Sequence, residues 1–195
     1  MEEKEKLIES IRAAFMGEQY PGDMDIVYDN TGFYLDVEEI KQKLIGKSWQ
    51  EADKEFLFSE RNDAPHFFSK AGFKYYIPAF MTAAVAYYDE MDDLPDALIG
   101  KFTFPEERDI AELEAAAKAG NALLPQFAAE PGDFFQRRLG GLAEEQRRFA
   151  EYMAEFNDAQ CKVIRAFLEY MQRCYDRGDL YNNPAVAVER YWKDF

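Results

Sequence analysis

The chain has 195 residues, a length typical of one domain, and its 48% hydrophobic and 16% aromatic content excludes a disordered or low-complexity protein. Its formal net charge of −15 argues against a nucleic-acid-binding or membrane-surface protein, because the longest basic runs are the pairs Arg137-Arg138 and Arg147-Arg148. The acid excess lies mainly in residues 1–100, which hold 21 acidic and 10 basic side chains. A partner that recognises charge should therefore be a basic protein that binds this half.

The N-terminal third is predicted to open with a helix. Apolar residues at helical spacing place this helix over residues 3–16, and Gly17 ends it. Residues 22–34 are interpreted as irregular, with a short extended piece at Asp25–Tyr28.

A second predicted helix covers residues 36–45, with Asp36 as its N-cap, and Gly46 ends it. Ser48 and Glu51 have the spacing of a capping box, in which each side chain accepts a hydrogen bond from the backbone of the other residue. Another short helix is therefore expected to begin at this point.

The strongest helical pattern covers residues 69–89 and begins with Ser69 as N-cap. Pro78 lies in its middle and lacks an N–H group, so the helix is expected to kink or restart there. The acidic segment that follows is expected to stop at Pro95. Phe102–Phe104 is interpreted as a connector, because no partner strand is evident.

Proline and glycine delimit the helices predicted for the second half. Pro105 opens a helix that Gly120 closes, and Pro131 opens a shorter one that ends at Gly140-Gly141.

Apolar residues at a spacing near 3.5 then continue through residues 149–174. One unbroken helix fits this pattern, but Asn157-Asp158 offers two good N-cap residues, and we favour two helices with a break there. Gly178 ends the second of them. Asn183-Pro184 then predicts a C-terminal helix within residues 183–195.

The sequence therefore predicts a single all-α domain over residues 1–195, with seven to nine helices. Its centre is the proline-kinked helix 69–89, and residues 158–177 are expected to pack against it.

Aromatic side chains are unusually dense between residues 67 and 88. On a helix, Phe73 and Phe80 share one face, whereas Tyr75 points well away from them. Burial of both faces in the core is the favoured interpretation, and a partner-binding groove is the alternative. The candidate binding residues of that groove are Trp49, His66, Tyr75 and Tyr76.

His66 is the only histidine of the chain, so any Ser–His or Cys–His catalytic arrangement has to use it. Ser59 and Ser69 lie near it in sequence, but neither has the pattern of a nucleophile elbow. We interpret His66 as structural and predict no catalytic residue.

The carboxylates within residues 89–96 offer oxygen ligands for Mg²⁺ or Ca²⁺, and Asp89 and Asp93 are expected to share a helix face. The order of ligands in an EF-hand is missing, so this run is interpreted as a solvated helix end. We expect neither a metal nor a cofactor.

The two cysteines and the N-terminal sequence bear on the compartment. Cys161 and Cys174 are expected about 20 Å apart on one helix, too far for a disulfide. The N-terminus lacks the apolar stretch of a signal peptide, and the uncharged run at residues 75–88 is too short to cross a membrane. We therefore expect a cytoplasmic protein.

Several segments resemble the bacterial family known as domain of unknown function 6714. They are IRAAF…YPG at residues 11–22, GKSW at 46–49, FFSKAGFKYYIPAFMTAAV at 67–85 and, towards the end, FAEYMAEFNDAQCKVIRAFLEYM at 149–171.

The resemblance covers residues 5–90 and 145–172, and residues 105–141 then look like an insertion, with the C-terminal helix at 183–195 as an addition. It implies a small cytosolic bacterial protein. It brings no known activity and no known functional residue.

Three classes of function stay open. The leading hypothesis is a non-enzymatic acidic module that binds a basic protein, as an immunity-type inhibitor of a toxin does. The second is a metal-dependent enzyme that uses the carboxylates of residues 89–96. The third is a structural or regulatory subunit that oligomerises through an aromatic face, and the oligomeric state itself is not predicted.

Overall fold

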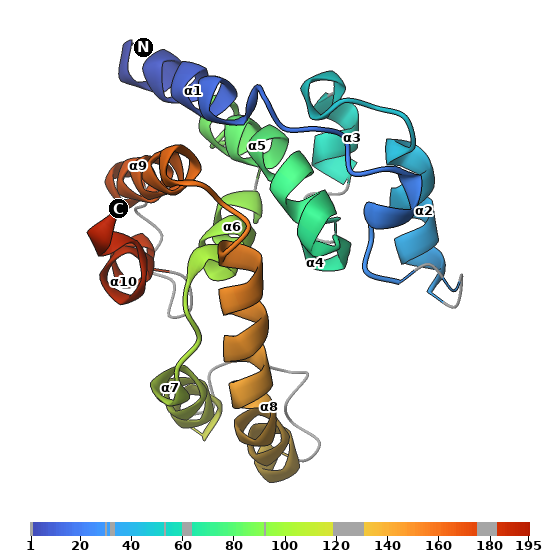
Figure 1. Cartoon of the computed structure of the whole chain (residues 1–195). Coiled ribbons are helices and arrows are strands. Elements are labelled where there is room, and N and C mark those ends of the chain that lie inside the picture. The colour runs from blue at the N-terminus through green and yellow to red at the C-terminus, as the bar shows by residue number, and fades with distance from the viewer. Residues whose placement is uncertain are drawn as a thin grey trace. The chain divides into compact units, whose positions relative to one another are not determined.

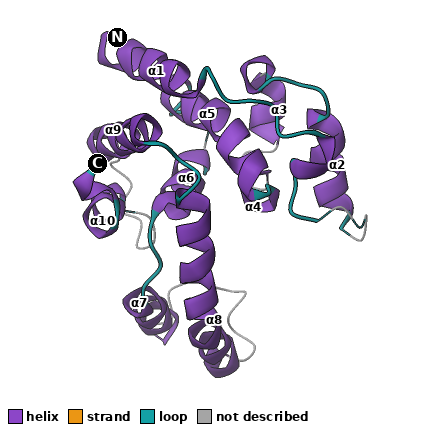
Figure 2. Ribbon diagram, in the orientation of Figure 1, coloured by secondary structure: helices purple, strands orange, loops and turns teal. Residues whose placement is uncertain are grey.

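The computed structural model describes most of the chain as helices (Figure 1). It describes residues 2–29, 31, 34–52, 54–59, 64–91, 93–118, 131–174 and 183–195. In this part of the chain there is no β-strand, and one isolated antiparallel bridge pairs Val27 with Phe68 (Figure 2). The predicted all-α class is confirmed.

Ten α-helices lie in the described residues, and eight of them have seven or more residues, against seven to nine predicted. They are α1 (Glu2–Phe15), α2 (Leu35–Leu44), α3 (Lys54–Ser59), α4 (Ala64–Phe67), α5 (Lys70–Ala86), α6 (Leu94–Phe102), α7 (Glu107–Lys118), α8 (Pro131–Met153), α9 (Asp158–Cys174) and α10 (Pro184–Arg190). Short 3₁₀ turns η1 (Asp23–Asp25) and η2 (Trp49–Glu51) lie between helices, and η4 (Trp192–Asp194) follows α10.

The chain divides into two compact units. The first combines Met1–Thr103 with Tyr152–Phe195, and the second is Phe104–Glu151. The segment predicted as an insertion, residues 105–141, lies within the second unit.

Helix α5 forms the centre of the first unit. Phe73 and Phe80 are at most 1% exposed, and Tyr75, on another side of the helix, is 6% exposed, so α5 is buried around most of its circumference. Helix α1 packs on α5 and α9, and α9 also contacts α5 and α10 (Figure 1). The predicted packing of the 158–177 helix on the central helix is confirmed for α9.

The expected restart of the central helix at Pro78 does not occur, because α5 runs from Lys70 to Ala86 with Pro78 inside it. Proline removes the hydrogen bond to the carbonyl of Lys74. Pro78 is itself buried, and the neighbours that surround α5 keep both halves in one helix.

The start of α5 is fixed by contacts with the chain after α1. Ser69 is the N-cap, as predicted: its Oγ accepts a hydrogen bond from the Gly72 N–H (3.0 Å) and donates one to the Asp25 carbonyl. The Tyr28 N–H donates to the Phe67 carbonyl (3.0 Å), and the Ser69 N–H donates to the Ile26 carbonyl (3.0 Å). Of the predicted extended piece at Asp25–Tyr28, Val27 forms the bridge, whereas Asp25 belongs to η1 and Ile26 has helical dihedral angles.

Helix α2 has its N-cap two residues earlier than predicted, so Asp36 is not the N-cap. Tyr34 occupies the N-cap position without a side-chain hydrogen bond, and Asp36 lies in the first turn, where its charge favours the helix N-terminus. Gly46 follows the helix with a φ of 69°, and the Ser48–Glu51 capping box is confirmed.

Helix α6 was not predicted, because Pro95 was interpreted as a stop. Pro95 instead occupies the first turn of the helix, where its missing N–H has no intrahelical partner to lose. Leu94, Leu98 and Phe102 are each 0% exposed, and their burial stabilises the helix.

A polar network joins α1, α5 and α9. Asn157 Oδ1 accepts from the Gln160 N–H (3.0 Å), and Gln160 Oε1 accepts from the Asn157 N–H (3.1 Å), which caps α9. The fully buried Gln160 also donates to Glu18 (2.6 Å), and Lys74 forms an ion pair with Glu18 (3.3 Å). The predicted break at Asn157-Asp158 is confirmed.

Both cysteines lie on α9 and are free thiols, as expected, with Cys161 buried. Asn183 caps α10 by accepting a hydrogen bond from the Ala185 N–H (2.9 Å), as predicted. The predicted helix ends at Gly120 and Gly178 lie outside the described residues.

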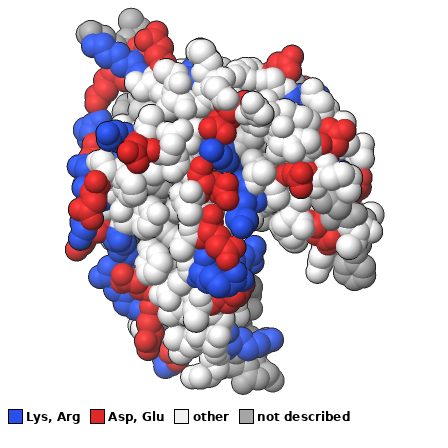
Figure 3. All heavy atoms as spheres, viewed as in Figure 1, with Lys and Arg blue, Asp and Glu red and all other residues white. Residues whose placement is uncertain are grey.

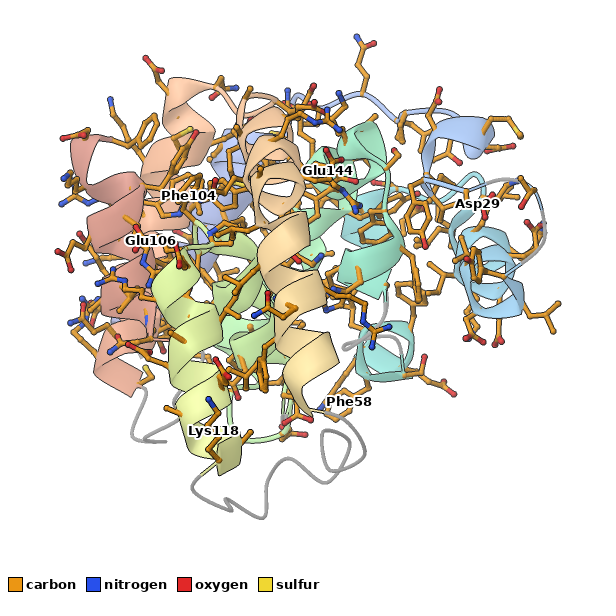
Figure 4. All side chains as sticks on the ribbon, turned by 90° about the horizontal axis from the view of Figure 1, so that it is seen from below. Asp29, Phe58, Phe104, Glu106, Lys118 and Glu144 are labelled. Carbon is orange, nitrogen blue, oxygen red and sulfur yellow. The ribbon has the colours of Figure 1, made fainter. Side chains whose placement is uncertain are left out.

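The second unit contains α7 and most of α8. Ile110 and Leu113 of α7 and Phe135 of α8 form its small core. Phe104 packs on Phe149 with ring centroids 5.5 Å apart, and Gln146 donates to the Pro105 carbonyl (3.0 Å). Figure 4 shows Glu106 just before the start of α7 and Lys118 at its end.

The prediction that a helix ends at Gly140-Gly141 is wrong, because α8 continues through both residues to Met153. A glycine inside a helix costs only about 1 kcal/mol relative to alanine. Leu139 and Leu142 pack on the core on either side of the pair, and Arg147 pairs with Glu144 and Glu151 one turn away in each direction. These contacts outweigh the unfavourable helix propensity of the two glycines.

Candidate functional site

Tyr75 and Tyr76, two of the predicted binding residues, are buried. Tyr75 is 6% exposed and Tyr76 is 0% exposed, and their rings contact each other edge to face with centroids 4.9 Å apart. The Tyr76 hydroxyl lies 3.0 Å from the Leu44 carbonyl and 2.9 Å from the Lys47 carbonyl. This burial supports the interpretation of the tyrosines as core residues.

A third tyrosine, Tyr20, completes this group, and sequence reasoning missed it. Its ring lies 5.7 Å from that of Tyr75. Its hydroxyl donates to Asp23 Oδ1 (2.5 Å) and accepts from the Gly46 N–H (2.9 Å). Burial, as the main cause, raises the pKa of both Tyr20 and Tyr76, so the phenols stay neutral near pH 7. The tyrosine cluster (Tyr20, Tyr75, Tyr76) joins the chain after α1 to the end of α2 and to α5.

Trp49 and His66, the other two predicted binding residues, lie in different settings. Trp49 begins η2, which packs on α5; the side chain is 3% exposed, and its Nε1 has no hydrogen-bond partner among the described residues. His66 lies in the last turn of α4 and is exposed. Partial desolvation of the ring, followed by the charge of Lys101, lowers the His66 pKa to about 4, so the imidazole is neutral at pH 7.

Asp89 and Asp93 do not share a helix face, contrary to the prediction. Both are exposed and lie in the turn between α5 and α6, because α5 ends at Ala86. Asp92 lies outside the described residues. Elsewhere in the described part of the chain, no group of three or more His, Cys, Asp or Glu side chains is placed to hold a metal ion.

An exposed surface of mixed apolar and acidic character lies around η1 and the first turns of α2. Its large apolar side chains are strongly exposed: Met24 60%, Tyr28 47%, Tyr34 52% and Leu35 80%. The other exposed large apolar residues in the described part of the chain are Met16, Tyr87 and Phe195. Six carboxylates lie among the four, and we call the whole set the acidic–apolar surface: Asp23, Met24, Asp25, Tyr28, Asp29, Tyr34, Leu35, Asp36, Glu38 and Glu39.

The positive charges next to this surface are few. The sequence has no Lys or Arg between residues 21 and 40. Lys41 is 7% exposed, with its Nζ 3.8 Å from Met24 Sδ and 3.8 Å from Glu38, and Lys43 forms an ion pair with Glu39 (2.8 Å). In Figure 3 the side of the molecule that holds α2 and α3 shows acidic side chains and little basic surface.

Backbone contacts hold the η1 side of the surface in place. The Tyr28 ring packs on Phe67 with centroids 6.2 Å apart, beside the bridge between Val27 and Phe68. Asp29, on the loop that leads towards α2 (Figure 4), accepts a hydrogen bond from the Thr31 N–H (2.8 Å). Met24 is held against α2 through Lys41.

The sequence contains one signal for this surface. Within the acidic first half, two stretches lack Lys and Arg altogether, residues 13–40 and residues 75–100, and the first of them contains all the residues of this surface. The exposure of Met24 and Leu35 could not be predicted, since both have the composition of core residues.

The described helices include none that is both long enough and apolar enough to span a membrane.

Comparison with known proteins identifies a family but no individual related protein or structure. No curated protein and no solved structure matches the chain. One family model, described as a family of unknown function, matches residues 3–120. This range contains the predicted part at 5–90 and also α7, whereas it stops short of 145–172, where the resemblance stays a prediction. Since the match spans more than half of the sequence, the chain belongs to the family of unknown function DUF6714.

Proposed function

We propose that the protein is an acidic binding module that engages a basic protein partner through the acidic–apolar surface. The observation that carries this proposal is the concentration of six carboxylates in residues 23–39, a stretch without Lys or Arg. Of the two lysines that follow it on α2, Lys41 is buried and Lys43 forms an ion pair with Glu39. A surface of one charge sign raises the rate at which an oppositely charged protein finds it. An immunity-type inhibitor, which covers a basic toxin, is one form of such a module.

This proposal changes the role of Tyr75 and Tyr76, which the sequence suggests as candidate binding residues. Both side chains are buried and act on the surface only indirectly, through Tyr20 of the same cluster, which donates a hydrogen bond to Asp23. The side chains available to a partner are those of the acidic–apolar surface itself.

The test begins with low-salt capture of proteins from the host cell, and each captured protein is then purified and its binding measured. We compare the wild type with Asp25→Asn/Asp36→Asn/Glu39→Gln. The matched control, Glu107→Gln/Glu112→Gln/Glu155→Gln, removes the same charge from exposed positions elsewhere.

We expect a basic partner whose association rate constant falls about tenfold in the surface variant at low salt and is nearly unchanged in the control. The difference should shrink as salt rises, because the Debye length drops to about 3 Å at 1 M. The proposal would be contradicted by a partner that binds the surface variant and the control equally well. It would also be contradicted by a partner whose association rate constant does not depend on the salt concentration.

A further inference from the structure

We infer that the occupant of the acidic–apolar surface is a short amphipathic segment of the partner, rich in Lys and Arg and carrying bulky apolar side chains. This inference rests on the proposed function and specifies the kind of partner. A polybasic segment without apolar anchors would leave the apolar part of the surface uncovered.

The first argument is the local density of exposed apolar side chains. Single exposed hydrophobic residues are ordinary, whereas clusters mark interaction sites. Met24, Tyr28, Tyr34 and Leu35 fall within twelve residues of sequence, and each exposes between 47% and 80% of its surface.

The second argument is the alternation of the two side-chain types. Met24 lies between Asp23 and Asp25, Tyr28 precedes Asp29, and Leu35 precedes Asp36. A ligand that covers one of these apolar groups therefore brings its neighbouring atoms close to a carboxylate. The complementary ligand also alternates, with a cationic group next to each apolar one.

The third argument is the chemistry of the apolar side chains. Tyrosine gives a large contact area at a low cost in conformational entropy, and the flexible thioether of methionine adapts to the shape of its neighbour. Met24 keeps its sulfur next to Lys41 and still exposes most of its side chain. Such groups suit an aliphatic or aromatic anchor better than a bare lysine.

The fourth argument is that part of the surface is already formed. The bridge at Val27–Phe68 and the hydrogen bond between Tyr20 and Asp23 fix the η1 side, and α2 carries Leu35. A surface fixed in advance loses little conformational entropy on binding. Acidic residues then determine mainly the association rate, and apolar residues the dissociation rate.

Two synthetic peptides of equal length and net charge test the inference. In the first, lysines alternate with leucine and phenylalanine, and in the second the apolar residues are replaced by serine. Fluorescence anisotropy measures the Kd of each for the full chain at about 0.1 M salt. The variants are Met24→Ser/Leu35→Ser and, as a matched control, Met16→Ser, since Met16 is 70% exposed outside the surface.

We expect the amphipathic peptide to bind at least about tenfold more tightly than the serine peptide. The Met24→Ser/Leu35→Ser variant should remove this advantage by speeding dissociation, and Met16→Ser should keep it. Circular dichroism of each variant confirms that it is folded.

The failures are distinguishable. If both peptides bind equally, and neutralising Asp25 and Asp36 weakens both, the inference is overturned and the proposed function stands. If neither peptide binds, both fail. Tighter binding of the amphipathic peptide that survives in Met24→Ser/Leu35→Ser also overturns the inference, because the site then lies elsewhere.

Discussion

The absence of a Cβ atom at Gly72 allows the backbone of the bridge segment to pack closely against α5. A Cβ built at this position would lie 1.9 Å from the Ile26 carbonyl oxygen, and this oxygen accepts the hydrogen bond from the Ser69 N–H. Any side chain at residue 72 therefore separates the bridge segment from α5. The η1 side of the acidic–apolar surface depends on this close approach of two backbones.

We expect Gly72→Ala to lower the free energy of unfolding by about 3 kcal/mol, the upper part of the range for overpacked sites, because the clash is with backbone. Urea denaturation measures this change, and it should come with weaker peptide binding at the surface. An unchanged unfolding midpoint would show that the bridge does not form in solution.

His66 gives a pH dependence whose sign follows from its setting. In the folded chain its pKa is lowered to about 4 by desolvation and then by Lys101, against 6.5 for an unperturbed histidine. Between these values the unfolded chain binds the proton and the folded chain does not. Stability from this group is therefore complete above pH 6.5 and is lost as the pH falls towards 4. Because the side chain is exposed, solvent screening keeps the effect small.

The NMR titration of this single histidine should have a midpoint well below 6.5, and His66→Gln should flatten the fall in unfolding midpoint between pH 6.5 and 4 relative to wild type. Lys101→Ala should move the NMR midpoint upwards. A midpoint at or above 6.5 would mean that the ring is fully hydrated.

At the scale of helices, local signals were predictable and long-range ones were not. The caps at Ser48, Ser69 and Asn183 use atoms within three residues, so sequence spacing alone identifies them. Continuity through Pro78 and through Gly140-Gly141 depends on neighbours distant in sequence. Propensity is a weak prior that such packing overrides.

The same limit explains the site. The tyrosine segment of α5 had enough apolar residues to be recognised as central, but Tyr75 and Tyr76 turned out to be covered by Tyr20 and by the end of α2. No pattern in the sequence shows which neighbours cover the second face of a helix. The exposure of Leu35 could not be predicted either, because no pattern in the sequence shows which apolar side chains stay uncovered.

Helix α8 can be stabilised by substitution at its glycine pair, Gly140 and Gly141. A Cβ added at Gly140 or Gly141 meets nothing within 4 Å, in contrast to Gly72. Alanine lowers the entropy that the unfolded chain loses on forming the helix. We expect Gly140→Ala/Gly141→Ala to stabilise the helix by about 1 kcal/mol per site, measured as a higher midpoint of thermal unfolding by circular dichroism. A lower midpoint would reveal that another part of the chain packs against these glycines.

At the scale of the whole molecule, the charges that sum to −15 are unevenly distributed. On α8, Arg147 forms ion pairs with Glu144 and Glu151, and such pairs cancel charge locally. Around η1 and α2 the carboxylates have few basic neighbours and enclose exposed apolar groups. The acid excess of the first half was predictable from composition, whereas its focus on one surface required the fold.

The central claim is that basic, apolar-anchored ligands bind at residues 23–39. Titration of the ¹⁵N-labelled chain with the lysine–leucine–phenylalanine peptide tests it most directly, because every backbone amide reports its own environment. The account predicts that the largest shift changes fall on Met24, Tyr28 and Leu35, while the amides of α7 stay unchanged. Shift changes centred on α7 and α8, or spread evenly over the chain, would contradict it.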